Sequence, residues 1–194
     1  IRDRLSSDDL STPGVLSPVA ARIVLKILYL ARFKRVDLLW SVNMLAREVT
    51  KWTRACDKRL HRLVSYIAHT KEWKQTCYVG DRVEKCQLVL YADASFAGDL
   101  EDSKSTGGCF LALIGPNTFA PITWICKKQG AVSHSSTEAE VIALEAALRM
   151  EGIPAIMFWE LVVEVLNPLT AGGDAVLLSG DKGENVESVR RDSK

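Results

Sequence analysis

The sequence lacks the cysteine pairs and the long apolar runs that mark several large classes of protein. None of its five cysteines forms a Cys-x-x-Cys pair, which argues against a structural zinc site and favours a reduced intracellular compartment. No apolar stretch approaches the roughly 20 residues of a membrane helix, and no N-terminal run is typical of a signal peptide. We therefore expect no membrane partner.

The small net charge hides two halves of opposite sign. The chain of 194 residues carries +1, but residues 21–85 hold 15 Lys/Arg against 6 Asp/Glu, and residues 86–194 hold 8 against 15. A basic half beside an acidic half fits a nucleic-acid-binding surface next to a carboxylate-rich catalytic centre. Solvated helix faces beside an acidic domain explain the same split equally well.

The first part of the chain has the periodicity of helices. Residues 1–16 are polar and are expected to form a loop or a disordered end. Ser17-Pro18 is typical of a helix start. Apolar residues then recur at helical spacing in three stretches ending near Thr70, which predicts three helices. The stripes are Ile23, Ile27 and Leu30; Leu38, Val42, Leu45 and Val49; and Leu60, Leu63, Val64 and Ile67.

The later part of the chain has the pattern of strands. Residues 135–137 offer a helix cap, and the helix after them is expected to kink or break at Gly152 and Pro154. Residues 175–178 form a further strand, and the tail from residue 183 can start another helix. The order β-β-β-α-β-α predicts an α/β fold: a mixed sheet with an antiparallel meander first and a helical crossover to a parallel strand. Three apolar runs with short connections form the meander: residues 87–92, 107–115 and 120–126.

Carboxylates stand at the ends of three of these elements. Asp93 follows the first strand of the meander, Glu140 lies in the first turn of the helix, and Asp181 follows the last strand, with Asp174 as its competitor. Taken singly, each is explained by a turn acid or by the helix dipole. Hydrolysis of a phosphodiester by two metal ions, however, needs several carboxylates at one point. Mg²⁺ prefers such hard oxygen ligands.

The first turn of that helix holds two glutamates with different expected roles. Two residues apart on a helix, they point in different directions. Glu140 precedes Ala143 by three residues and Leu144 by four, so we expect it on the inward face. Glu138 is better placed as a capping acid.

Four sequence blocks follow one another in this part of the chain: YADASFAGD (residues 91–99), SKSTGG (103–108), ITW with KKQ (122–129), and SSTEAE with IAL (135–144). In this order they resemble the ribonuclease H domain of copia-type LTR retrotransposon Pol polyproteins. The resemblance covers residues 87–190, and residues 28–37 with the helices after them resemble the segment that joins reverse transcriptase to ribonuclease H. The paired Asp motif of the polymerase is absent, so we expect no DNA synthesis.

The resemblance implies a domain with a ribonuclease H-like mixed sheet. It also implies that this domain cleaves the RNA strand of RNA–DNA hybrids. Asp93, Glu140 and Asp181 would be its catalytic carboxylates and would bind Mg²⁺, or Mn²⁺ in its place. Expected partners are the hybrid and the reverse-transcriptase and integrase portions of the same polyprotein, in a cytoplasmic retroelement particle or in the nucleus. Candidate nucleic-acid contacts are Lys104, Lys127, Lys128, Ser136 and Thr137, although exposed solubilising lysines explain the first three equally well.

The sequence departs from this family in ways that bear on activity. The family's fourth carboxylate follows its last helix, and the sequence stops at Lys194 before that point, so we expect a C-terminally truncated domain with weak or absent cleavage. The alternatives are an impaired remnant that only binds nucleic acid, and a structural connection module. The expected divisions are a polar end (1–16), a helical connection-like segment (17–85) and the ribonuclease H-like domain (86–194).

Overall fold

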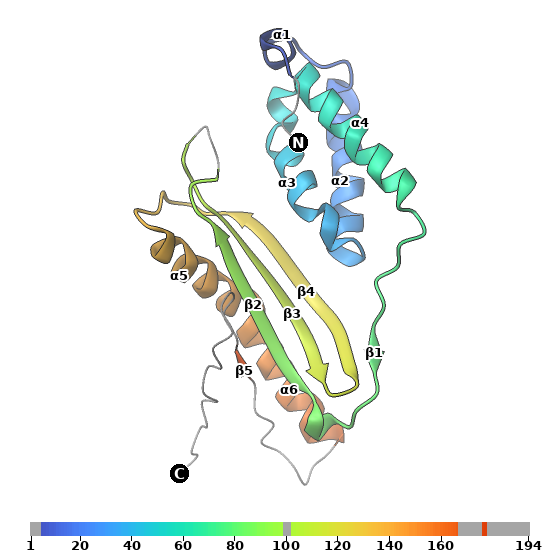
Figure 1. Ribbon diagram of the computed structural model, residues 1–194, viewed down its shortest axis with the longest axis vertical. Helices are drawn as coiled ribbons and strands as arrows, with labels where there is room; N and C mark the ends of the chain where they lie inside the picture. Colours follow the sequence, from blue (N-terminus) through green and yellow to red (C-terminus); the bar gives the residue numbers. More distant parts are fainter. Residues whose placement is uncertain (1–4, 99–101, 167–175, 178–194) are drawn as a thin grey trace. The chain divides into compact units, whose positions relative to one another are not determined.

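The computed structural model describes residues 5–98, 102–166 and 176–177 (Figure 1). The chain divides into two compact units, residues 1–75 and residues 76–194. Among the described residues, no helix has the length and apolar character needed to cross a membrane.

The first unit is helical, as its periodicity predicts. The three expected helices are α2 (Ser17–Phe33), α3 (Leu39–Arg47) and α4 (Arg54–His69), joined by short 3₁₀ turns at Val36–Leu38 and Val49–Lys51. Their apolar stripes form the core, with Val24, Leu38, Val42 and Leu60 at most 2% exposed. Proline at the start of α2 fits the helix because its missing N–H would have no partner there.

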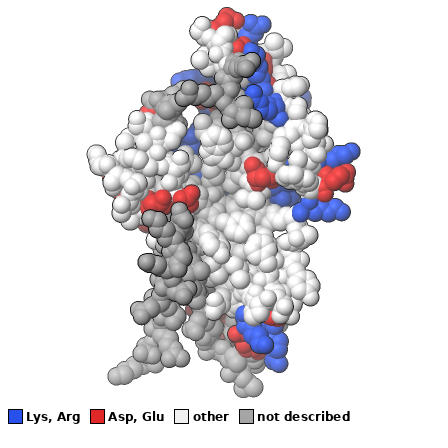
Figure 2. All heavy atoms as spheres, in the orientation of Figure 1, with Lys and Arg blue, Asp and Glu red and all other residues white. Residues whose placement is uncertain are grey.

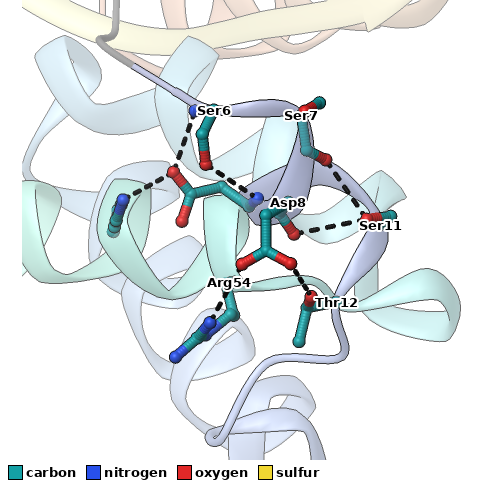
Figure 3. A network of polar contacts seen from close by, with 8 residues as sticks. Ser6, Ser7, Asp8, Ser11, Thr12 and Arg54 are labelled. Atoms are coloured by element: carbon teal, nitrogen blue, oxygen red, sulfur yellow. Dashed lines mark hydrogen bonds and ion pairs between the residues drawn. The ribbon is translucent and has the colours of Figure 1, made fainter.

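A short helix, α1 (Ser7–Ser11), stands where the sequence predicted only a loop or a disordered end. Ser6 caps it, because its hydroxyl accepts from the Asp9 N–H at 3.2 Å while Asp9 accepts from the Ser6 N–H at 3.0 Å. Two ion pairs tie α1 to α4: Arg54 to Asp8 at 3.2 Å, and Lys58 to Asp9 at 2.6 Å (Figure 3). Tertiary contacts therefore stabilise a helix too short to form alone.

The second unit is a mixed sheet with helices against it. Its strands are β1 (Tyr78–Val79), β2 (Gln87–Ser95), β3 (Thr106–Gly115), β4 (Thr118–Lys128) and β5 (Val176–Leu177). They lie in the order β1-β4-β3-β2-β5; β5 is parallel to β2 and all other pairs are antiparallel. The predicted meander and the helical crossover to a parallel strand are confirmed, whereas β1 and a 3₁₀ turn at Val83–Lys85 were not foreseen.

Helices α5 (Ser136–Ala147) and α6 (Ile153–Leu166) pack against one face of the sheet (Figure 1). Alternate side chains of β2 and β3 meet them, as period-two alternation requires. The core consists of Cys86, Leu88, Leu90, Ala92, Cys109, Leu111, Leu113 and Ala147, with Leu144, Leu148 and Trp159 packed against it.

The expected break between the two helices is a single π-helical turn, Leu148–Gly152. Gly152 is buried, and a Cβ added there would lie 3.1 Å from the Leu90 Cδ2 atom. Glycine therefore lets the turn approach β2, while Pro154 occupies the second position of α6, directly after the π-helical turn.

Candidate active site

Asp93 lies near the end of β2 with its side chain exposed. Its cross-strand partner on β3 is Gly108. Since Leu90 and Ala92 point into the core beneath the helices, alternation places Asp93 with Tyr91 on the other face of the sheet. The carboxylate is thus at the mouth of the sheet and open to a ligand.

Glu140 is the fifth residue of α5, just past the first turn that holds Glu138, and it is exposed, so the prediction that it faces inward was wrong. The inward positions belong to Ala139, Ala143 and Ala147, each at most 5% exposed. These alanines recur every four residues and so form one stripe along the helix. Glu140 follows the first of them and lies on the flank of the helix.

A close contact between α5 and β3 brings the two carboxylate-bearing elements together. A Cβ added to Gly107 would lie 3.1 Å from the Ala143 Cβ atom. Gly107 pairs across the sheet with Ala94, the residue after Asp93. Glu140 precedes Ala143 by three residues, which on a helix makes them surface neighbours. The contact therefore joins the elements that carry the two acids: Glu140 lies beside it on α5, whereas Asp93 is one residue from Ala94 and points to the other face of the sheet.

Glu138 is engaged in capping, as the sequence predicts. Ser135 caps α5, and its Oγ atom accepts from the Glu138 N–H at 3.0 Å. The Glu138 carboxylate in turn accepts from the His134 N–H at 2.6 Å. Among the residues that the structure describes, Asp93 and Glu140 have no side-chain partner of this kind. The two glutamates of this turn thus differ: one holds the helix end, and the other is available to a ligand.

The remaining predicted carboxylates, Asp181 and Asp174, lie outside the described residues. Within the described part of the chain, no three His, Cys, Asp or Glu side chains converge on a possible metal position. The third ligand therefore stays a prediction. Even without a third ligand, Asp93 and Glu140 are exposed carboxylates of the type that binds Mg²⁺. This ion commonly binds through one or two carboxylates and keeps much of its water.

The predicted nucleic-acid contacts differ in their surroundings. Lys127 is exposed and lines a pocket of about 180 Å³ between β3, β4 and α5. Lys128 forms an ion pair with Asp102 at 2.8 Å, and Lys104 lies 3.9 Å from the same carboxylate. Ser136 and Thr137 are exposed at the start of α5. Of these three lysines, Lys127 is therefore the one whose positive charge is least neutralised by acidic side chains among the described residues.

Sequence reasoning missed three buried polar residues beside this site: Ser105, Gln129 and Ser133. They lie where β3 begins and where the chain leaves β4 for α5. Ser105 and Gln129 belong to the recognised blocks, but their burial was not foreseen. One feature of the sequence could have indicated this burial, namely a glutamine at the end of an apolar strand. That signal is weak, because polar residues in such places are more often exposed.

Comparison with known proteins relates this chain to the polyproteins of retrotransposons. It is 37% identical over 118 residues to the retrovirus-related Pol polyprotein from transposon RE2 of Arabidopsis thaliana, and 36% identical over 118 residues to that from transposon RE1. Over the matched residues the chain is similar to these retrovirus-related Pol polyproteins, as a fragment of a retrotransposon Pol polyprotein would be. Each match covers 61% of this chain but only 8% of the polyprotein.

A further relative of the chain is much shorter than the polyproteins, so the match covers most of its length. The secreted RxLR effector protein 161 of Plasmopara viticola is 33% identical over 121 residues, which cover 62% of this chain and 80% of that protein. No family model matches the chain. No solved structure matches it either.

Proposed function

We propose that residues 76–194 form a ribonuclease H-type endonuclease that cleaves the RNA strand of RNA–DNA hybrids by two-metal hydrolysis. The observation that carries the proposal is the contact of Gly107 with Ala143, which joins the sheet end that carries the exposed Asp93 to the helix that carries the exposed Glu140. A structural role accounts poorly for this pair, because neither acid caps a helix or holds an ion pair with a described residue.

In this proposal Asp93 and Glu140 would hold Mg²⁺ or Mn²⁺, with Asp181 as the third ligand on the basis of its place after the last predicted strand. The bound metal would activate water and stabilise the leaving 3′ oxygen. Lys127 would offset phosphate charge at the pocket beside α5. The hybrid would be recognised by backbone shape and 2′-hydroxyl contacts, without base reading.

The relatives also suggest the setting in which the chain works. Both Arabidopsis relatives are Pol polyproteins, so the reverse-transcriptase and integrase portions of such a polyprotein are the proposed protein partners. All five cysteines are free, which fits a reduced intracellular compartment such as a cytoplasmic retroelement particle or the nucleus.

The test is cleavage of a labelled RNA–DNA hybrid by the full chain in Mg²⁺ or Mn²⁺. Asp93→Asn and Glu140→Gln should each abolish cleavage of the RNA strand. Glu138→Gln is the matched control, because it lies in the same turn but serves the cap; it should cost about 0.5–1 kcal/mol of stability and leave the rate nearly unchanged. If Glu138→Gln abolishes cleavage while Glu140→Gln does not, the metal ligand has been assigned to the wrong glutamate.

A second candidate function is nucleic-acid binding without cleavage. The observation in its favour is the charge of residues 1–75, which hold 15 Lys/Arg against 7 Asp/Glu. On the face drawn in Figure 2, basic side chains over these helices are interspersed with acidic ones. Hybrid that is bound but not cut, with an affinity falling steeply as salt rises, would favour this function over the nuclease.

A further inference from the structure

A chain of buried hydrogen bonds runs from the loop after β2 to the first turn of α5. The Ala97 N–H donates to Ser105 Oγ at 3.1 Å, and the Gln129 N–H donates to the Ser105 carbonyl at 2.8 Å. The Gln129 side chain then donates from Nε2 to the Ala139 carbonyl at 2.8 Å. Ser133 completes the set by donating to Gln129 Oε1 at 2.9 Å.

The members of this chain are shielded from water. Ser105 is 0% exposed, Ser133 is 4% and Gln129 is 7%. Inside a protein such bonds are stronger than in water, and a lost partner leaves a costly unpaired group. A buried glutamine whose two side-chain ends are both bonded is held in one conformation.

One end of the chain lies in the loop after β2, the strand that carries Asp93, and the other lies in α5 next to Glu140. Ala97 follows Asp93 by four residues, and its positive φ of 47° is a conformation that alanine rarely adopts, so the bond to Ser105 helps to hold it. Ala139 immediately precedes Glu140. The network thus connects the two elements that carry the carboxylates through the ends of β3 and β4.

We infer that Gln129 is a positioning residue, which holds the first turn of α5, and with it Glu140, in register with the end of β2 that carries Asp93. The inference rests on the proposed metal-dependent nuclease. Gln129 touches neither metal nor substrate in this scheme. Outer-shell partners of this kind typically change metal affinity or activity by about 10–100-fold when they are lost.

Two variants separate the bonds of this side chain. Gln129→Met keeps the approximate shape and removes both bonds. Gln129→Glu keeps the acceptor for Ser133 but, when ionised, removes the donor to the Ala139 carbonyl. Because the bond to α5 carries the effect, both variants should raise the Mn²⁺ Kd about tenfold and lower kcat for hybrid cleavage with KM little changed.

The matched control is Thr118→Val, at the opposite end of β4. Thr118 is also buried, at 4% exposed, and its Oγ1 atom donates to Asp81 at 2.7 Å while accepting from the Gly80 and Asp81 N–H groups. This variant should lower Tm by a similar amount and leave the Mn²⁺ Kd and kcat within about twofold of wild type.

A structural readout keeps the inference testable apart from the nuclease. Amide exchange in residues 94–98 and 136–141 should accelerate about tenfold in Gln129→Met and not in Thr118→Val. Wild-type chain that neither binds Mn²⁺ nor cuts hybrid would refute the proposed function, and exchange alone would then decide whether Gln129 couples the two elements. Wild-type Kd, kcat and exchange in a destabilised Gln129→Met would overturn the positioning role, as would equal defects in Thr118→Val.

Discussion

Replacing Arg35 with methionine removes the central cation of a buried cluster in the helical unit. The Arg35 side chain is 9% exposed and donates two bonds to Asp37, at 2.9 and 2.8 Å. It also donates to the Thr70 carbonyl and hydroxyl, at 3.1 and 2.8 Å. These contacts join the turn after α2 to the end of α4. Methionine keeps much of the apolar stem and leaves every one of these acceptors without its donor.

The expected cost follows from burial. Removing one partner of a fully buried ion pair costs roughly 3–5 kcal/mol. The Asp37 side chain is still 32% exposed and also accepts from the Tyr66 hydroxyl at 3.0 Å, so water and Tyr66 recover part of the loss. We expect about 2–3 kcal/mol, a large share of the roughly 4–11 kcal/mol available to a unit of this size.

The assay is urea unfolding of Arg35→Met, Asp37→Asn and the double variant, followed by tryptophan fluorescence. Trp73, whose ring lies 6.1 Å from that of Tyr66, is one of the five tryptophans that contribute to this signal. Coupling between the two substitutions should be about 1–2 kcal/mol. Strict additivity, or a loss for Arg35→Met below about 0.5 kcal/mol, would refute the reasoning, because either result would mean that the pair is solvated like one on the surface.

Acid gives an independent check of the same pair. The hydrogen-bonded Arg35 guanidinium lowers the pKa of Asp37 below its ordinary 3.8. Stability from this group is therefore fully present above pH 3.8 and is lost as the pH falls through the lowered pKa. Arg35→Met should therefore reduce the loss of folding stability as the pH falls. Part of the acid-induced loss of stability will remain, because a second carboxylate contributes to it. The bond from Lys58 and those from Ser6 lower the pKa of Asp9 to about 2.

Three further substitutions test the sheet unit. Leu90→Ala, at a residue 1% exposed in the core, should cost about 3–5 kcal/mol in urea unfolding, and a loss under about 1 kcal/mol would contradict that packing. Gly107→Val should push against Ala143, lowering Tm by an amount equivalent to about 1–3 kcal/mol and abolishing hybrid cleavage; unchanged cleavage would argue against the contact. Ser135→Ala should cost about 1 kcal/mol of stability through the lost cap, with cleavage retained, as thermal melting and the hybrid assay would report.

The sequence predicted secondary structure correctly wherever a long pattern was compatible with only one type of element. Helices α2 to α4 follow from apolar spacing near 3.6 residues, and the meander of β2 to β4 follows from three apolar runs with short connections. Helix α1 and strand β1 were missed because five and two residues carry no period. They depend on distant partners: α1 on the ion pairs with α4, and β1 on pairing with β4.

The candidate site was predictable in position but not in orientation. The strand end gives Asp93, and the capping pattern gives the first turn of α5. The inward direction was assigned to Glu140 by its spacing from Ala143 and Leu144, yet the helix turns its alanines inward, beginning with Ala139. The alanine stripe was visible in the sequence, and small side chains are what a helix needs when it packs closely on a strand at a glycine such as Gly107.

The exposed position of Glu140 suits the proposed chemistry better than the inward position would have. A carboxylate turned into the core between α5 and the sheet would need a buried cation or hydrogen-bond donors, and otherwise burial would favour its neutral form. The polar groups described in that contact are already used, since Gln129 donates to Ala139 and accepts from Ser133. By packing alanine against glycine, α5 approaches β3 closely and leaves Glu140 on its flank, where a hydrated metal ion and a phosphate can both reach it.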